Sequence, residues 1–201
     1  MTSQPSTPSS TAATTGPGMC GDSAPGRSVA ALSSRVLILA RRECQESPEG
    51  FADRAGVAPE VMSEAENGTQ PAWALPYDEF TAIADAVSAV DPGLRVLFEA
   101  ATACDLLLNC VLDGDQVLAT DVLVEPASRD LARALLRLAA AGELDHALAV
   151  PGLPRVPGEP PVLSDTQVAL LRDRAAALAA SESPDAWVGE EILAACRGGR
   201  S

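Results

Sequence analysis

The side chains of this chain that are suited to chemistry are mostly carboxylates and guanidinium groups. Asp and Glu number 28 against 14 basic residues, all of which are Arg, and the formal net charge is −14 over 201 residues. The sequence contains no phosphate-binding glycine loop and no pair of catalytic carboxylates in a Gly-rich context, so we do not expect an enzyme. The acidity favours solubility and argues against binding to anionic membranes or non-specific coating of nucleic acid.

The thiols and the single imidazole form no recognisable metal or nucleophile pattern. The cysteines include no C-x-x-C pair, and His146 lies far from all of them in the sequence. An odd number of cysteines without metal-ligand spacing predicts reduced, mostly buried thiols in a cytoplasmic protein, with no zinc and no cofactor. The N-terminus lacks a charged segment followed by an apolar one, so it is not expected to be a secretory signal. The cysteines are Cys20, Cys44, Cys104, Cys110 and Cys196.

Residues 47–68, SPEGFADRAGVAPEVMSEAENG, have the spacing of two short helices joined by a tight turn. Ser47 is suited to cap the first helix, and Pro48 follows at the first helical position, where its missing N–H costs nothing. Gly56 stands where that helix must end, because glycine accepts a positive φ without a Cβ clash. The second helix opens at Pro59 and ends at Gly68. Apolar residues at helical spacing predict the inward face, namely Phe51, Ala52, Ala55, Val57, Met62 and Ala65.

This pattern, S-x-E-x-x-A-x-x-A-G-V followed by S-x-x-E-x-G, resembles the helix-turn-helix domain of the Cro and phage-repressor (XRE) family. The resemblance covers about residues 32–90, less than half of the chain. It implies a DNA-binding transcriptional regulator with the motif at about residues 48–67, whose second helix would enter the major groove. The matching residues are Ser47, Glu49, Ala52, Ala55, Gly56, Val57, Ser63, Glu66 and Gly68, with Leu37 and Arg41 falling where the family has the apolar and basic residues of its first helix.

The resemblance also implies which residues would meet DNA. Base edges would be read from the second helix of the motif, where a Glu can accept a hydrogen bond from cytosine and a Val can touch a thymine methyl group. The candidate DNA-binding residues are Arg41, Ser47, Pro48, Arg54, Pro59, Glu60, Val61, Ser63, Glu64 and Asn67. The chain departs from the family at Pro48 and Gly50, at Glu46, where the family has an apolar residue, and in a longer connection over residues 69–77.

The charge of this region opposes ordinary DNA binding. Residues 34–90 contain four Arg and ten Asp or Glu, which leaves a net charge of −6. Neutralisation of phosphates supplies most non-specific affinity for DNA, so we expect weak binding per monomer that needs a dimer or a partner. Arg41, Arg42 and Arg54 are the available phosphate contacts. Two alternatives stay open: Glu60 and Glu64 form a solvated face, or the motif is a non-DNA-binding adaptor or an antitoxin-like acidic partner of a basic protein.

The whole chain is expected to be all-α. Its apolar residues are mainly Ala, Leu and Val, and aromatic residues make up only 3%, a composition that favours helices packed through small side chains. We expect a disordered tail at residues 1–28 because it is rich in Ser, Thr, Pro and Gly. A helix-turn-helix domain of about five helices would follow at residues 29–93, with its first helix at 29–44. Its fourth helix is indicated by Phe80, Ile83, Ala84 and Val87.

The remainder predicts a helical C-terminal region. Residues 94–112 are apolar on two faces, which indicates a core helix or a homodimer interface, and their polar residues argue against a membrane span. Residues 116–124 fit either a strand or a helix. A single helix or a pair of helices is expected from Ser128 to Val150. Arg129, Arg133 and Arg137 form a basic stripe there that faces solvent, an acidic partner, a phosphate backbone or the acidic motif itself. A Pro-rich linker at 151–163 would then lead to a helical pair at 164–201.

Overall fold

The computed structural model describes residues 31–113, 126–141 and 163–198, and every regular element in this part of the chain is helical. The all-α prediction is therefore confirmed. Several predicted segments lie outside the described residues, namely the tail at 1–28, the segment 116–124, His146 and residues 151–162 of the linker. The last linker residue, Leu163, is described and is buried. None of the described helices has the length and apolar character needed to cross a membrane.

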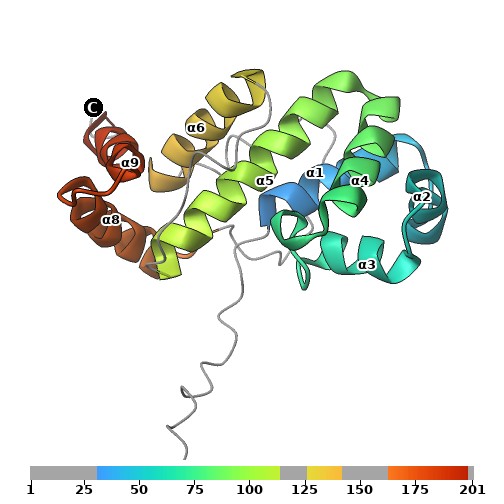
Figure 1. The fold of residues 1–201 in the computed structure, drawn as a ribbon, viewed down its shortest axis with the longest axis horizontal. Helices are drawn as coiled ribbons and strands as arrows, with labels where there is room; N and C mark the ends of the chain where they lie inside the picture. The colour runs from blue at the N-terminus through green and yellow to red at the C-terminus, as the bar shows by residue number, and fades with distance from the viewer. Residues whose placement is uncertain (1–30, 114–125, 142–162, 199–201) are drawn as a thin grey trace, which may run out of the picture.

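Four helices gather at one end of the molecule (Figure 1). They are α1 (Ala31–Glu43), α2 (Pro48–Ala55), α3 (Pro59–Asn67) and α4 (Tyr77–Val90), with a short 3-10 turn at Ala72–Ala74 between the last two. α1, α2 and α3 begin and end within about two residues of the predicted positions, and α4 contains the four residues that indicate a fourth helix. The core among them is formed by fully buried side chains, namely Leu37, Phe51, Met62, Ile83 and Val87.

A single long helix, α5 (Pro92–Asp113), runs through the molecule and packs against elements on both sides of it. Its 22 residues span about 33 Å. Near its start Phe98 stacks on Phe80 of α4, with ring centroids 5.6 Å apart. Small residues along α5 allow its neighbours to approach closely, and these are Ala100, Ala101, Ala103 and Cys104, all buried. The apolar stretch predicted at 94–112 is thus a core helix in this chain.

The other end of the molecule is formed by α6 (Pro126–Ala141), α8 (Asp165–Ala179) and α9 (Ala186–Gly198). Both C-terminal helices pack back on the rest of the fold, α8 against α5 and α9 against α6 (Figure 1). Ser164 and Gln167 form a reciprocal capping box at the start of α8. The last helix starts at Ala186, after a turn in which Ser183 Oγ accepts a hydrogen bond from the Asp185 N–H.

Two buried carboxylates on α5 hold the first turns of other helices. Asp105 is fully buried and accepts hydrogen bonds from the Leu32 N–H (3.3 Å), the Ser33 N–H (2.9 Å) and Ser33 Oγ (2.7 Å), so it caps α1 from outside that helix. Burial raises the pKa of Asp105 to about 7, and this effect outweighs the donors from Ser33 and Leu32, which lower it. Glu99 accepts from Ser128 Oγ at 3.0 Å in the first turn of α6 and pairs with Arg95.

Candidate functional site

The predicted helix, turn and helix at residues 47–68 are present in the structure. The Ser47 hydroxyl accepts the Gly50 N–H at 3.1 Å, and Pro48 is the first residue of α2. Gly56 ends α2 with φ of 71°, in the left-handed region. A Cβ on Gly56 would meet no atom within 4 Å, so glycine is required by the backbone angle alone. Gly68 ends α3 in the same way, with φ of 75°.

The buried faces of α2 and α3 decide which residues remain available for binding. Phe51 and Ala52 of α2 and Met62 and Ala65 of α3 are buried in the core. Val61, the residue proposed to touch a thymine methyl group, is half-buried and packs against the same core. Only part of its side chain therefore remains available for such a contact. The exposed residues of α3 are Pro59, Glu60, Ser63, Glu64 and Asn67.

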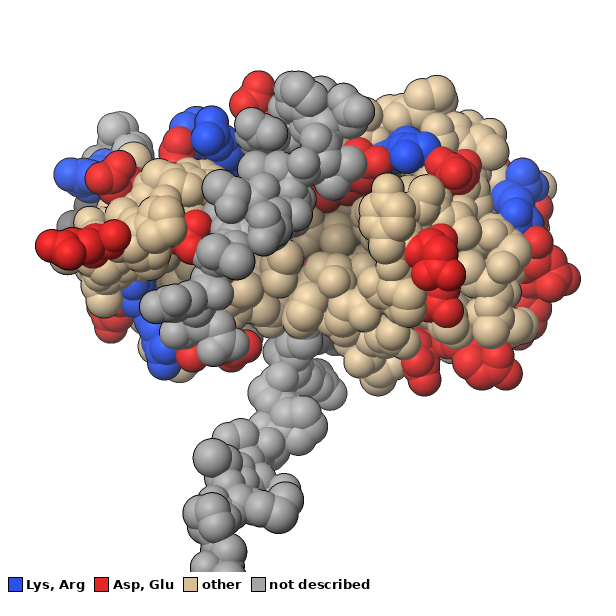
Figure 2. Space-filling view, viewed as in Figure 1, with Lys and Arg blue, Asp and Glu red and all other residues tan. Residues whose placement is uncertain are grey.

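The exposed surfaces of α2 and α3 are dominated by carboxylates. Glu49 and Asp53 are exposed on α2, and Glu60 and Glu64 on α3. Acidic side chains gather along the edge of the lobe where these helices lie in Figure 2. The pKa of Glu49 is lowered first by its own backbone N–H and then by the Ser47 side chain, so this carboxylate is charged at neutral pH. We name these four residues the acidic surface.

Arg41 is not free to contact phosphate. Its Nε and Nη2 donate to the two oxygens of Glu66 at 2.6 and 3.1 Å, and its Nη1 donates to the Glu46 carbonyl at 3.1 Å. All three guanidinium nitrogens therefore have acceptors within the chain. Ser34 Oγ donates to the Ala65 carbonyl at 2.6 Å, so α1 holds α3 by this bond as well as by the ion pair.

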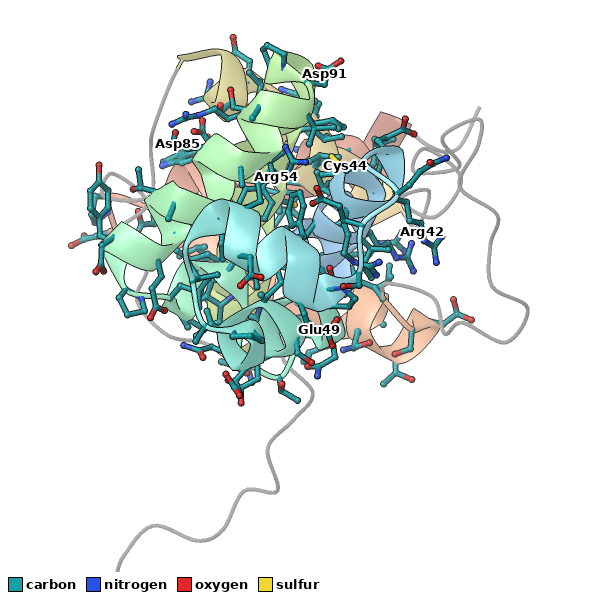
Figure 3. The ribbon with its side chains drawn as sticks, turned by 90° about the vertical axis from the view of Figure 1, so that its right-hand side faces the viewer. Arg42, Cys44, Glu49, Arg54, Asp85 and Asp91 are labelled. Atoms are coloured by element: carbon teal, nitrogen blue, oxygen red, sulfur yellow. The ribbon has the colours of Figure 1, made fainter. Side chains whose placement is uncertain are left out.

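Arg54 is also paired within the chain. Its Nε donates to both carboxylate oxygens of Glu46, at 3.1 and 3.2 Å, and its Nη2 donates to the same group. Figure 3, which looks onto this end of the molecule, shows Arg42 at the side of the fold, well apart from Arg54. Arg42 is exposed and has no ion-pair partner within the described residues. Of the three arginines proposed as phosphate contacts, only Arg42 is unpaired in this part of the chain.

The remaining predicted residues are committed in part to the backbone. Asn67 Oδ1 accepts from the Thr69 N–H at 2.9 Å and from Thr69 Oγ1 at 2.5 Å, so its oxygen stabilises the turn after α3. The Ser47 hydroxyl is used as a cap, and Ser63 is exposed. The ten predicted residues thus lie on α2, on α3 and on neighbouring residues of α1 and the turn before α2. The two arginines among them, Arg41 and Arg54, are neutralised by glutamates of the chain.

The basic stripe on α6 faces α9. Arg133 lies over the ring of Trp187, with 5.0 Å from its guanidinium carbon to the ring centre, and Arg137 pairs with Glu191. The side chain of Arg129 lies outside the described residues. The expectation of a solvated face holds for Arg137, whose side chain is 54% exposed, but not for Arg133, which is half-buried against Trp187. Their partners, 54 residues away in the sequence, could not be recognised from local spacing.

The sequence did not identify Glu46 and Glu66 as functional residues. Glu46 stood out only as a departure from the family pattern, and no spacing rule joins it to Arg54 eight residues later or joins Glu66 to Arg41. Among the described cysteines Cys104 is buried and Cys44, Cys110 and Cys196 are half-buried, and none of the four forms a disulfide. No group of three His, Cys, Asp or Glu side chains in the described ranges is placed to hold a metal ion.

Comparison with known proteins adds no assignment. Neither a family model, nor a curated protein, nor a solved structure matches this chain.

Proposed function

We propose that the acidic surface of α2 and α3 binds a basic protein partner, so that the chain acts as an adaptor or as an acidic antagonist of that partner. The observation that carries this proposal is the charge of the exposed side chains. Four carboxylates face solvent on these two helices, while Arg41 and Arg54 are each neutralised by a glutamate of the chain.

The placement of these carboxylates supports binding to cations. Glu49 and Asp53 stand four residues apart on α2, and Glu60 and Glu64 stand four residues apart on α3. Each pair puts like charges on neighbouring turns, which costs an isolated helix about 0.2–0.5 kcal/mol. A surface of one sign attracts a partner of the opposite sign, speeds its association and rejects partners of the same sign. A lysine- or arginine-rich protein surface has the required chemistry.

DNA is the second candidate partner, and the geometry of α2 and α3 favours it. The two helices are joined by a short turn, and Pro59 and Glu60 at the start of α3 are exposed, in the part of a recognition helix that contacts base edges. In this reading the protein is a transcriptional regulator of the Cro type whose affinity per monomer is low. A homodimer or a second protein would then supply the missing phosphate contacts.

The experiment compares both ligands on the same protein. The full chain is titrated into a fluorescent arginine-rich peptide and, separately, into a library of DNA duplexes at about 150 mM salt. We expect the peptide to bind with an affinity that falls as salt increases, and the duplex library to show no enriched sequence. An enriched palindrome with half-sites one helical turn apart would instead establish the DNA regulator and a dimer.

A matched pair of variants assigns the binding to the acidic surface. Glu60→Gln with Glu64→Gln removes two charges from α3, whereas Asp173→Asn with Glu190→Gln removes two exposed charges from α8 and α9. We expect the first variant to weaken peptide binding by about tenfold and the second by less than about twofold, because screening limits a charge effect to about one Debye length. Equal losses in the two variants would refute the assignment to α3.

The same surface can be tested with the opposite charge. Glu60→Arg with Glu64→Arg is expected to abolish peptide binding and to strengthen binding to DNA at low salt, with a steeper dependence on salt concentration. Unchanged binding to both ligands would show that the exposed face of α3 contacts neither.

A further inference from the structure

We propose that Glu46 is a specificity residue that excludes polyanions such as nucleic acid from the α2 and α3 surface. The inference rests on the proposed function, since it explains how a helix pair of this geometry is reserved for a cationic partner. Glu46 is absent from the acidic surface defined above, and its role follows from its contacts with two arginines.

Glu46 is fixed by the turn between α1 and α2. Its N–H donates to the Arg41 carbonyl at 3.3 Å, and its own carbonyl accepts Arg41 Nη1 at 3.1 Å. The preceding residue, Gln45, has φ of 58°, in the left-handed region that non-glycine residues rarely adopt. The backbone at Glu46 is thus held to Arg41 in both directions, and this places its side chain against Arg54.

The carboxylate of Glu46 neutralises Arg54 at the surface. Side-chain exposure is 40% for Arg54 and 26% for Glu46, so both members of the pair can be reached from solvent. The Arg54 hydrogen bond lowers the pKa of Glu46, and the carboxylate is therefore charged at neutral pH. An approaching phosphate meets no net charge at this ion pair. If the phosphate displaced Glu46 from Arg54, the phosphate and the Glu46 carboxylate would lie side by side and repel each other.

Arg41 is also neutralised by a glutamate of the chain, Glu66, in a less exposed ion pair. The side chains of Arg41 and Glu66 are 18% and 10% exposed, and their contact is bidentate. A phosphate would have to break two hydrogen bonds in a partly desolvated site, where charged pairs are strongest. Of the two pairs, the exposed one at Glu46 is the one whose removal would make a guanidinium available without disturbing the packing between α1 and α3.

The substitution Glu46→Gln tests the inference because it keeps the side-chain length and both backbone hydrogen bonds. The matched control is Glu190→Gln, which removes the same charge from an exposed position on α9. The Nε–H signal of Arg54 is followed by NMR while a short DNA duplex is added at about 50 mM salt, and duplex affinity is measured against salt concentration. Thermal unfolding of each variant shows that the fold is intact.

We expect the Arg54 signal to respond to the duplex only in Glu46→Gln, with an affinity gain of about tenfold and a salt slope steeper by about 0.9, the value for one added phosphate contact. The inference is overturned if Arg54 responds equally in the wild-type protein, if it does not respond in Glu46→Gln, or if Glu190→Gln gives the same gain. Binding of the arginine-rich peptide by the wild-type protein tests the proposed function separately, because it does not depend on the difference between these variants.

Discussion

Among the glycines for which an added Cβ was placed, Gly189 is the one at which a methyl group should lower the stability of the fold most. It lies on α9, and a Cβ there would stand 2.4 Å from the Ala175 carbonyl oxygen and 2.6 Å from the Ala179 nitrogen, both backbone atoms of α8. Ordinary contact begins near 3.4 Å, so Gly189→Ala forces the two helices apart by about 1 Å, since a helix backbone cannot rotate away as a side chain does.

The size of the effect follows from two opposing contributions. Overpacking costs about 3 kcal/mol at the upper end of its usual range. The upper end applies here because the atoms that the new methyl group would meet belong to the backbone of α8. Replacing glycine by alanine inside a helix returns about 1 kcal/mol. The net loss of about 2 kcal/mol should lower the melting temperature by about 4–8 °C for a chain of this length.

Gly50→Ala is the matched control for Gly189→Ala. A Cβ at Gly50 would lie 3.6 Å from Ser47 Oγ and 3.8 Å from Glu46 Cβ, both ordinary contacts. This substitution should therefore raise the free energy of unfolding by up to about 1 kcal/mol through helix propensity. Thermal and urea unfolding followed by circular dichroism measure both variants. The close approach of α8 and α9 would be refuted if Gly189→Ala were as stable as Gly50→Ala.

Three further predictions concern stability. The pKa of Asp105 is about 7 in the folded protein against an ordinary value of 3.8, so the unfolded chain loses this proton first as the pH rises. The free energy of unfolding should therefore fall by about 2 kcal/mol between pH 5 and pH 7. Urea titrations of Asp105→Asn should lack this fall, and parallel profiles for the two proteins would contradict the prediction. Ser164→Ala should cost about 1 kcal/mol by removing the capping box, a loss that calorimetry would detect, and an unchanged melting temperature would count against the cap. Arg133→Met should lower the melting temperature more than Arg137→Met in the same assay. The Arg133 guanidinium lies over Trp187, whereas Arg137 forms a solvent-exposed ion pair worth less than about 1 kcal/mol. The reverse order would refute this reasoning.

Local signals in the sequence were sufficient for the elements at the candidate site. The cap at Ser47, the left-handed turn at Gly56 and the helix end at Gly68 each depend on one residue and its immediate neighbours, and all three stand where they were predicted. The apolar positions that face the core, such as Phe51 and Met62, followed from helical spacing because one face of each helix must be buried.

The electrostatic state of the site could not be predicted in the same way. Whether Arg41 is available for a phosphate depends on Glu66, which lies 25 residues away and reaches it only when α1 and α3 pack. The cap of α1 comes from Asp105, more than 70 residues further along the chain. Periodicity describes which face of a helix is buried, but it does not say which charged side chains the fold brings together.

The long helix α5 connects the acidic surface to the distant C-terminal pair through a shared hydrophobic core. Because α5 packs against α1 and α4 as well as α6 and α8, neither half can unfold without exposing apolar surface of the other. A ligand that binds only the folded state would therefore also slow proteolysis at α8 and α9, which it does not touch. Resistance of this remote helical pair to a protease becomes a reporter for partners of α2 and α3, usable before any partner has been identified.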